Sequence, residues 1–266
     1  MDKFLNISMF VFFLFALSLS VSAQTNSEIE NKIAIRLDKL EKAAFRTGTG
    51  DFDTLEKENK ALKEELLNYG KRPSIMKYDF PLLADKMSIV TSRDRRFRIY
   101  SWDNQQGGSG RIYEVVFQYL DSTGKSRASS YDAGGEGVVC APYYHQLFQM
   151  NMKGGPLYLA NSTAVCSGAL SGQELSIFRI EGKNLNKNVK LIKAAKGLAS
   201  SVSFEYDFFS VVDHPERPVK LIFFDEEKRS FKFPVVVEDP KFINGGRVTD
   251  KFITYKFNGK YFVKVS

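Results

Sequence analysis

The sequence is poor in the residues that build metal centres. Its 266 residues include two histidines, His145 and His214, and two cysteines, Cys140 and Cys166. A protein-bound metal usually takes three or four ligands in a recognisable spacing, and neither His-x-x-x-His nor Cys-x-x-Cys occurs here. The sequence therefore predicts no metal site and no cofactor.

The local motifs of common enzymes are also missing. The stretch Gly107-Gly108-Ser109-Gly110 differs from the Gly-x-Ser-x-Gly elbow of acyl-transfer enzymes. Neither histidine lies in a cysteine-hydrolase signature. A glycosidase, however, needs only two carboxylates brought together by the fold, and 31 acidic residues leave that reaction open. The sequence names no catalytic residue, and it favours a protein that is not an enzyme without excluding a hydrolase.

Long apolar runs are confined to the beginning of the chain. Lys3 is followed by an apolar run over residues 9–17 and by Val21-Ser22-Ala23, which supplies the small residues that signal peptidase requires. We therefore expect residues 1–23 to be a cleavable signal peptide. No later run reaches the roughly 20 apolar residues that a membrane-spanning helix needs. The sequence thus predicts an exported protein, periplasmic, outer-surface or secreted, that does not span the membrane after cleavage.

The few cysteines suit an exported protein. An even number of cysteines in an oxidising compartment favours a disulfide, which here would join Cys140 to Cys166. Two separate buried thiols are the alternative.

Charge of one sign is in modest excess. Lys and Arg number 38 and Asp and Glu 31, which gives a net charge of +7 spread along the chain. Such a charge supports solubility as readily as it supports binding to a polyanion. Because export separates the protein from cytoplasmic nucleic acid, we expect no nucleic-acid partner.

A helical hairpin is predicted over residues 24–72. Ser27 and Glu30 have the spacing of a capping box at the start of a first helix. Apolar residues then recur at three- and four-residue steps and make one stripe, formed by Ile29, Ile33, Leu37, Leu40 and Ala44. The Thr-Gly-Thr-Gly run at residues 47–50 breaks this pattern, because glycine favours a turn.

The second helix of the hairpin has its own signals. Asp53 or Thr54 can cap its start, and Gly70 and Pro73 end it. Its apolar face consists of Leu55, Leu62 and Leu66. We expect the hairpin to fold back onto the following sheet, with dimerisation through the helices as the alternative.

From about residue 87 the apolar period changes from helical to two. The clearest strand covers residues 202–208, where Val, Phe, Tyr and Phe alternate with Ser, Glu and Asp. Asn258-Gly259 is the strongest hairpin signal, since Asn-Gly accepts the positive φ angles of a type I′ turn. It would pair residues 252–257 with 260–264.

These patterns predict an α+β fold. Strands joined by short turns, without helices between them, pair antiparallel. We expect a signal peptide (1–23), a helical hairpin (24–72) and a largely antiparallel β-rich domain (73–266). The sequence does not decide between an open sheet, a sandwich and a barrel.

One stretch carries a family resemblance. Residues 89–103, which read Ile-Val-Thr-Ser-Arg-Asp-Arg-Arg-Phe-Arg-Ile-Tyr-Ser-Trp-Asp, and the following Gly107-Gly108 resemble a family of uncharacterised secreted proteins of Gram-negative bacteria. The order of a signal peptide, a charged helical segment and a β-rich remainder is similar, as is the ending at residues 255–262. The family has no established activity, so the resemblance implies a compartment and a fold but no mechanism.

The most unusual local sequence is a candidate ligand site. Trp102 is the only tryptophan, and it precedes Asp103, Asn104 and Gln105 at the expected end of a strand. An indole plate beside polar side chains can hold a sugar ring by stacking and hydrogen bonding. The alternative is that Trp102 belongs to the core and the polar residues form a turn.

A run of arginines precedes this segment. Arg93, Arg95, Arg96 and Arg98 surround Asp94, and strand alternation divides them between two faces. We interpret the run as a solvated hairpin rather than an anion site.

The combined features predict a non-enzymatic binding or interaction protein of the cell envelope. Its partner would be an unidentified protein or glycan. The alternative is a hydrolase that acts on a cell-wall or polysaccharide substrate through carboxylates from separate strands.

Overall fold

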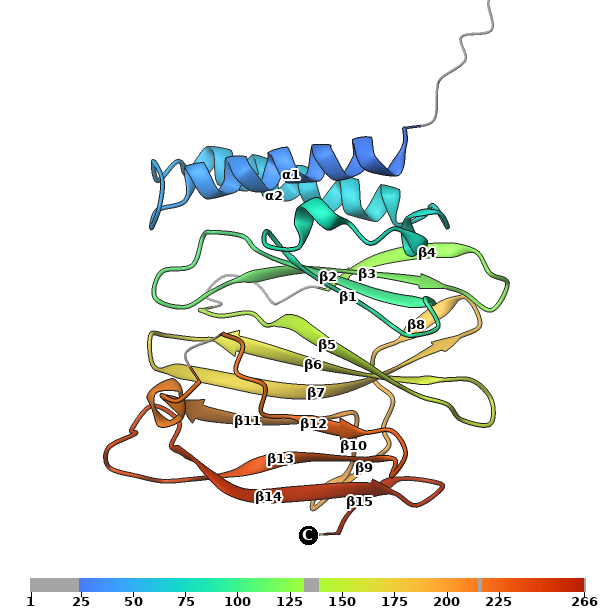
Figure 1. The fold of residues 1–266 in the computed structure, drawn as a ribbon, viewed down its shortest axis with the longest axis vertical. Coiled ribbons are helices and arrows are strands. Elements are labelled where there is room, and N and C mark those ends of the chain that lie inside the picture. The colour runs from blue at the N-terminus through green and yellow to red at the C-terminus, as the bar shows by residue number, and fades with distance from the viewer. Residues whose placement is uncertain (1–23, 132–138, 215–216, 266) are drawn as a thin grey trace, which may run out of the picture.

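The chain folds into four stacked layers, a pair of helices followed by three β-sheets (Figure 1). The computed structural model describes residues 24–131, 139–214 and 217–265. The predicted signal peptide, residues 1–23, lies outside the described residues. The predicted α+β class is confirmed, with an N-terminal helical hairpin and largely antiparallel sheets. The sheets are stacked face to face, and the layers follow one another nearly in the order of the sequence.

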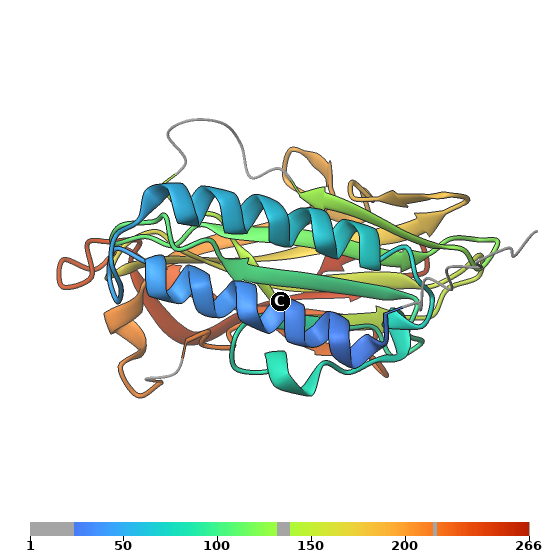
Figure 2. The ribbon, with the colours of Figure 1, turned by 90° about the horizontal axis from the view of Figure 1, so that it is seen from above.

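The first layer consists of α1 (Asn26–Ala43) and α2 (Phe52–Tyr69), which lie side by side over the first sheet (Figure 2). The predicted apolar stripes are confirmed, because every residue named in them is buried. The predicted caps are wrong by a few residues. The capping box of α1 is formed by Thr25 and Glu28, and Asp51 caps α2 by accepting a hydrogen bond from the Thr54 amide.

The physical reason for the first error lies in Glu30. Its carboxylate accepts hydrogen bonds from the Tyr78 hydroxyl at 2.6 Å and from the Leu82 amide at 2.7 Å. It therefore holds the segment between the helices and the first sheet, and it does not cap its own helix.

The second layer is a four-stranded sheet in the order β1-β2-β3-β4. Its strands are β1 (Ser88–Thr91), β2 (Phe97–Asp103), β3 (Tyr113–Leu120) and β4 (Ser126–Tyr131). Two short 3-10 helices, η1 (Ile75–Lys77) and η2 (Pro81–Leu83), connect it to α2.

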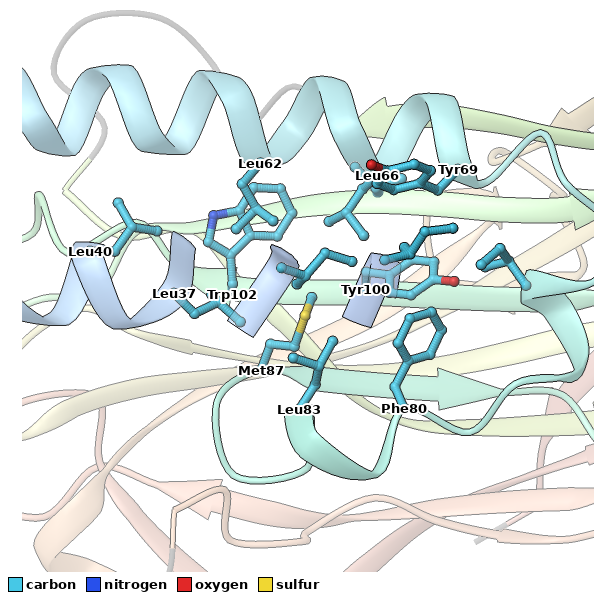
Figure 3. Close-up of a cluster of buried hydrophobic side chains, with 14 of the residues drawn as sticks. Leu37, Leu40, Leu62, Leu66, Tyr69, Phe80, Leu83, Met87, Tyr100 and Trp102 are labelled. Carbon is cyan, nitrogen blue, oxygen red and sulfur yellow. The ribbon is translucent and has the colours of Figure 1, made fainter. Parts of the chain in front are cut away.

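Strand β2 is buried on both faces. Tyr100 and Trp102 pack among the helix leucines (Figure 3), whereas Phe97 and Ile99 pack against the second sheet. The strand can have two apolar faces because it lies between two layers that each need a core.

Arg98 corrects the interpretation of the arginine run as a solvated hairpin. Its side chain is 1% exposed, and its guanidinium donates to the carbonyls of Ile75 and Met76 at 2.8 and 3.2 Å. The guanidinium also lies over the rings of Phe80 and Tyr100. Arg98 thus ties η1 to the first sheet.

The third layer is a second sheet in the order β11-β7-β6-β5, with the short strand β8 paired to β7. Its strands are β5 (Tyr143–Met150), β6 (Leu157–Val165), β7 (Leu170–Glu181), β8 (Asn184–Asn186) and β11 (Ser201–Asp207). The strand predicted over residues 202–208 is therefore present, and it continues into the 3-10 helix η3 (Phe208–Val211).

The fourth layer is a third sheet in the order β10-β9-β15-β14-β13-β12. Its strands are β9 (Ile192–Ala194), β10 (Gly197–Ala199), β12 (Phe223–Asp225), β13 (Ser230–Val237), β14 (Arg247–Phe257) and β15 (Phe262–Lys264). The predicted Asn258-Gly259 hairpin joins β14 to β15, with Phe257 opposite Phe262. The pairing of β15 with β9 is parallel, and the other strand pairings of the described residues are antiparallel.

The predicted disulfide is present. Cys140 and Cys166 are bonded, with their Cα atoms 4.8 Å apart. The bond joins the segment before β5 to the turn after β6. Within the described ranges, no helix is both long and apolar enough to cross a membrane.

Candidate functional site

Trp102 does not lie where a sugar-stacking residue must lie. The indole is 1% exposed and is covered by the helical hairpin (Figure 3). Its Nε1 donates a hydrogen bond of 3.0 Å to Oδ1 of Asn59, and the Asn59 amide donates in turn to the carbonyls of Leu55 and Asn104. The stacking hypothesis is therefore wrong for Trp102, and the core position that we considered as the alternative is correct.

The polar residues after Trp102 join layers of the protein to one another. Asp103 accepts from Arg111 at 2.9 Å and from Arg46 at 3.4 Å, and Gln105 accepts from Arg46 at 2.9 Å. Burial raises the pKa of Asp103, and the amide hydrogen bond from Gln105 opposes that rise. Asn104 is buried. These contacts fasten the loop between β2 and β3 to the turn of the helical hairpin.

A cleft lies elsewhere, between the first and second sheets. A cleft of about 1340 Å³ opens where the edge of the first sheet, at β3 and β4, passes over β6, β7 and β11. Its outer side is formed by the loop between β13 and β14. The two sheets are stacked directly on one another in Figure 1. The cleft between them therefore depends on the size of the side chains that face it.

The floor of the cleft is made by small and polar side chains of the second sheet. Strand alternation places Gly172, Glu174 and Ser176 of β7 toward the cleft, together with Ser162 and Ala164 of β6. The intervening β7 residues, such as Leu175 and Ile177, enter the core against the third sheet. Small side chains cannot fill the space that the first sheet leaves above them.

Two carboxylates lie close together on this floor. In the pairing of β7 with β11, Glu174 is opposite Ser203 and Glu205 is opposite Gly172. The two glutamates are therefore diagonal neighbours on one face of the sheet, where long side chains come within reach of the same ligand.

Aromatic rings form the inner wall. Phe117 contacts Tyr144 and Tyr131 with ring centroids 5.9 and 6.5 Å apart, and Tyr144 lies 6.1 Å from Phe178. Burial raises the pKa of the Tyr144 phenol, and the negative charge of Glu174 raises it further. Tyr144 therefore stays a neutral hydroxyl beside the carboxylate at physiological pH. Tyr131 and Phe242 add partly exposed rings to the lining, whereas the ring of Phe204 stacks on Phe233 on the opposite face of the sheet.

Among the described residues that line the cleft, Lys187 is the one with a cationic side chain. Its ammonium lies 5.1 Å from the centre of the Phe117 ring and donates to the carbonyl of Ser130 at 3.2 Å. Partial burial lowers its pKa. The lysine thus sits at the aromatic end of the cleft, near the edge strand of the first sheet.

Glycines position the loop that forms the outer side. Gly245 has φ of 100°, and a Cβ there would lie 2.9 Å from the Tyr206 amide nitrogen. The Asp207 amide donates to the carbonyl of Gly246 at 2.9 Å. A side chain at Gly245 would push the loop away from β11, so glycine is required for this wall of the cleft.

His145 does not take part in the cleft. Its Nε2 is 2.8 Å from the Thr163 hydroxyl, on the side of the second sheet that also carries Leu157 and Leu159. Burial, helped by the charge of Lys220, lowers its pKa to about 3, so the imidazole is neutral at physiological pH. Among the described residues, no group of three or more His, Cys, Asp or Glu side chains could hold a metal ion.

The sequence-based search missed the residues of the cleft. The available signal was a run of small and polar residues at alternate positions, with Ser162 and Ala164 in one strand and Gly172, Glu174 and Ser176 in the next. Such runs in buried strands indicate a face that is not packed against a core.

The arrangement offers a ligand flat aromatic surfaces, hydroxyl groups and carboxylates within one concavity. This chemistry suits binding by stacking and hydrogen bonding. The family resemblance of residues 89–103 stays a prediction. Comparison of the chain with protein-family models, with curated proteins and with solved structures gave no match.

Proposed function

We propose that this is an exported, non-enzymatic binding protein that holds a glycan in the cleft between its first and second sheets. The observation that carries the proposal is the composition of the cleft, whose lining combines the partly exposed rings of Tyr131 and Phe242 with Glu174 and Ser203. Sugars have an apolar C–H face and a rim of hydroxyl groups, so they fit a wall of aromatic rings beside acceptors and donors.

The disulfide supports the exported part of the proposal. Disulfides form and persist in oxidising compartments outside the cytoplasm, and Cys140 is bonded to Cys166. The bond lies beside the cleft, since the lining residues Pro142 and Ala164 are each two positions from a bonded cysteine. It therefore stabilises the loops around the proposed site.

A hydrolase acting on cell-wall or polysaccharide substrate is the second candidate. A glycosidase places two carboxyl groups roughly 5 to 10 Å apart on either side of the bond that it cleaves. Glu174 comes from the floor of the cleft and Glu238 from the loop after β13, so two separate elements supply carboxylates to one cavity. Glu174 and Glu205, by contrast, lie on the same face of one sheet, which suits binding better than cleavage.

A glycan array probed with the purified protein tests the proposal. We expect binding to a subset of glycans, and about tenfold or greater loss of affinity in Ala164→Trp, because the indole would fill the floor of the cleft. Ala195→Trp is the matched control, since Ala195 is exposed in the turn between β9 and β10.

The outcomes separate the two candidates. Absence of any glycan signal above background would overturn the proposal, as would unchanged binding by a folded Ala164→Trp variant. Release of new reducing ends from a bound polysaccharide would replace it with the hydrolase.

A further inference from the structure

The lining of the cleft differs in charge from the protein that contains it. The chain has a net charge of +7, yet four carboxylates line the cleft against one ammonium group in the described part of the chain. The carboxylates belong to Glu174, Glu205, Glu238 and Asp239. A basic protein therefore presents a locally negative concavity.

Three of these carboxylates form no ion pair with the residues that the structure describes. Asp239 is paired with Arg247 at 2.8 Å. Glu174 accepts a hydrogen bond from the Ser176 hydroxyl, and within the described ranges neither it, Glu205 nor Glu238 forms an ion pair. Unpaired carboxylates at the wall of a cavity attract a cationic ligand.

The aromatic residues of the cleft also favour a cationic ligand. Tyr144 is close enough to Glu174 for the carboxylate to raise the pKa of its phenol. The partly exposed rings of Tyr131 and Phe242 also line the cleft, and the faces of aromatic rings attract positive charge. Ring faces and carboxylates together favour an ammonium group carried on a flat, partly apolar framework.

The cleft is long enough for more than one ring. Its floor extends along β7 from Gly172 to Phe178, which is roughly 20 Å at the rise of a strand. Glu174 and Glu205 lie toward the Gly172 end, and Lys187 lies toward the Phe178 end. An extended oligomer can therefore place several groups along the floor at once.

We infer, on the basis of the proposed function, that the glycan held in the cleft carries free amino groups, as an oligomer of glucosamine does. Glu174 and Glu205 on the floor and Glu238 on the loop would accept hydrogen bonds from its ammonium groups. An N-acetylated oligomer has the same rings but no charge, so it would lose these contacts.

Calorimetric titration of the purified protein with a glucosamine hexamer and an N-acetylglucosamine hexamer tests the inference. We expect the glucosamine hexamer to bind about tenfold tighter, which corresponds to one charge-assisted hydrogen bond. The double variant Glu174→Gln/Glu205→Gln should remove this preference. Glu56→Gln is the matched control, because Glu56 is an exposed glutamate on α2. A pentalysine peptide is the third ligand, since it carries amines without sugar rings.

Each result decides something different. Equal or tighter binding of the N-acetylated hexamer, or a preference that survives in the folded double variant, would overturn the inference but leave a glycan-binding cleft in place. Tighter binding of pentalysine than of glucosamine would overturn it in favour of a basic peptide. Failure of both hexamers, together with a blank glycan array, would overturn the proposed function itself.

Discussion

The two faces of the second sheet differ in how tightly their side chains are packed, although they belong to the same strands. On the face toward the third sheet, Leu157, Leu159, Leu175 and Ile177 are fully buried in a continuous core. On the face toward the first sheet, Tyr158 and Phe178 are buried in a core with Phe97, but Gly172, Glu174 and Ser176 leave a cleft beside it. Both faces are carried by the same backbone and the same strand pairings. The difference shows that side-chain size, rather than strand pairing, decides where the space between two layers is filled and where it stays open to a ligand.

The largest effect is expected on the closed face. Leu175→Ala should lower the free energy of unfolding by about 4 kcal/mol, because it removes apolar contacts and leaves a cavity. Urea denaturation followed by circular dichroism measures this. A loss below about 1 kcal/mol would mean that the two faces are packed more alike than the structure shows.

The disulfide is expected to matter next, because it joins two segments that each lead into the lining of the cleft, at Pro142 and Ala164. Replacing Cys140 and Cys166 together by Ser should lower the free energy of unfolding by about 3 kcal/mol, since the bond closes a loop over a sequence separation of 26 residues. The same denaturation experiment under non-reducing conditions measures it. Identical denaturation midpoints for the variant and the parent protein would contradict the prediction.

His145 gives the closed face a dependence on pH. Its pKa is about 3 in the folded protein against an ordinary value of 6.5 for histidine, so the unfolded chain binds more protons between these values. Stability should therefore fall as the pH is lowered from about 6.5 toward 3. His145→Gln should flatten this part of the profile of denaturation midpoint against pH, and an unchanged slope would count against a buried neutral imidazole.

Asp121 should act in a different pH window. Its carboxylate accepts hydrogen bonds from Thr123 and Arg127, among others, and these hold its pKa below the usual 3.8. It stabilises the folded state above pH 3.8, and the stabilisation is lost as the pH falls further. Asp121→Asn should therefore lower stability at neutral pH and reduce the loss below pH 4, measured by the same midpoints.

The smallest effect is expected on the open face. Glu205→Gln removes a charge but no packing, since Glu205 is exposed in the cleft and has no ion pair among the described residues. The free energy of unfolding should change by less than about 0.5 kcal/mol. A loss comparable to that of Leu175→Ala would show that the cleft is part of the folding core rather than a site.

Local features of the fold were predictable from the sequence. The helix stripes, the strand over residues 202–208, the Asn258-Gly259 hairpin and the disulfide all depend on short-range pattern or on cysteine number, and all are present. The capping box was misplaced because Thr25/Glu28 and Ser27/Glu30 have the same spacing. Only the contacts of Glu30 with Tyr78 and Leu82 distinguish them, and those contacts are 48 and 52 residues away in the sequence.

The site was not predictable, for a related reason. Trp102 is unusual in the sequence, but its burial depends on a hairpin more than 30 residues earlier that folds back over β2. The cleft takes its lining from segments as distant as Phe117 and Gly246. A cavity between two layers depends on the side chains of both layers together, so no single segment of the sequence reveals it.

The route of the chain through the layers has a consequence for how the molecule can be assembled. The helices and the first sheet end by residue 131. During synthesis, these two layers could therefore fold before the rest of the chain has emerged from the ribosome. Strand β11 is the exception, because the chain visits the third sheet at β9 and β10 and then returns to the edge of the second. The floor that carries Glu205 is therefore finished late, by a strand that arrives after its neighbours, and a ligand can be held there only once that strand is in place.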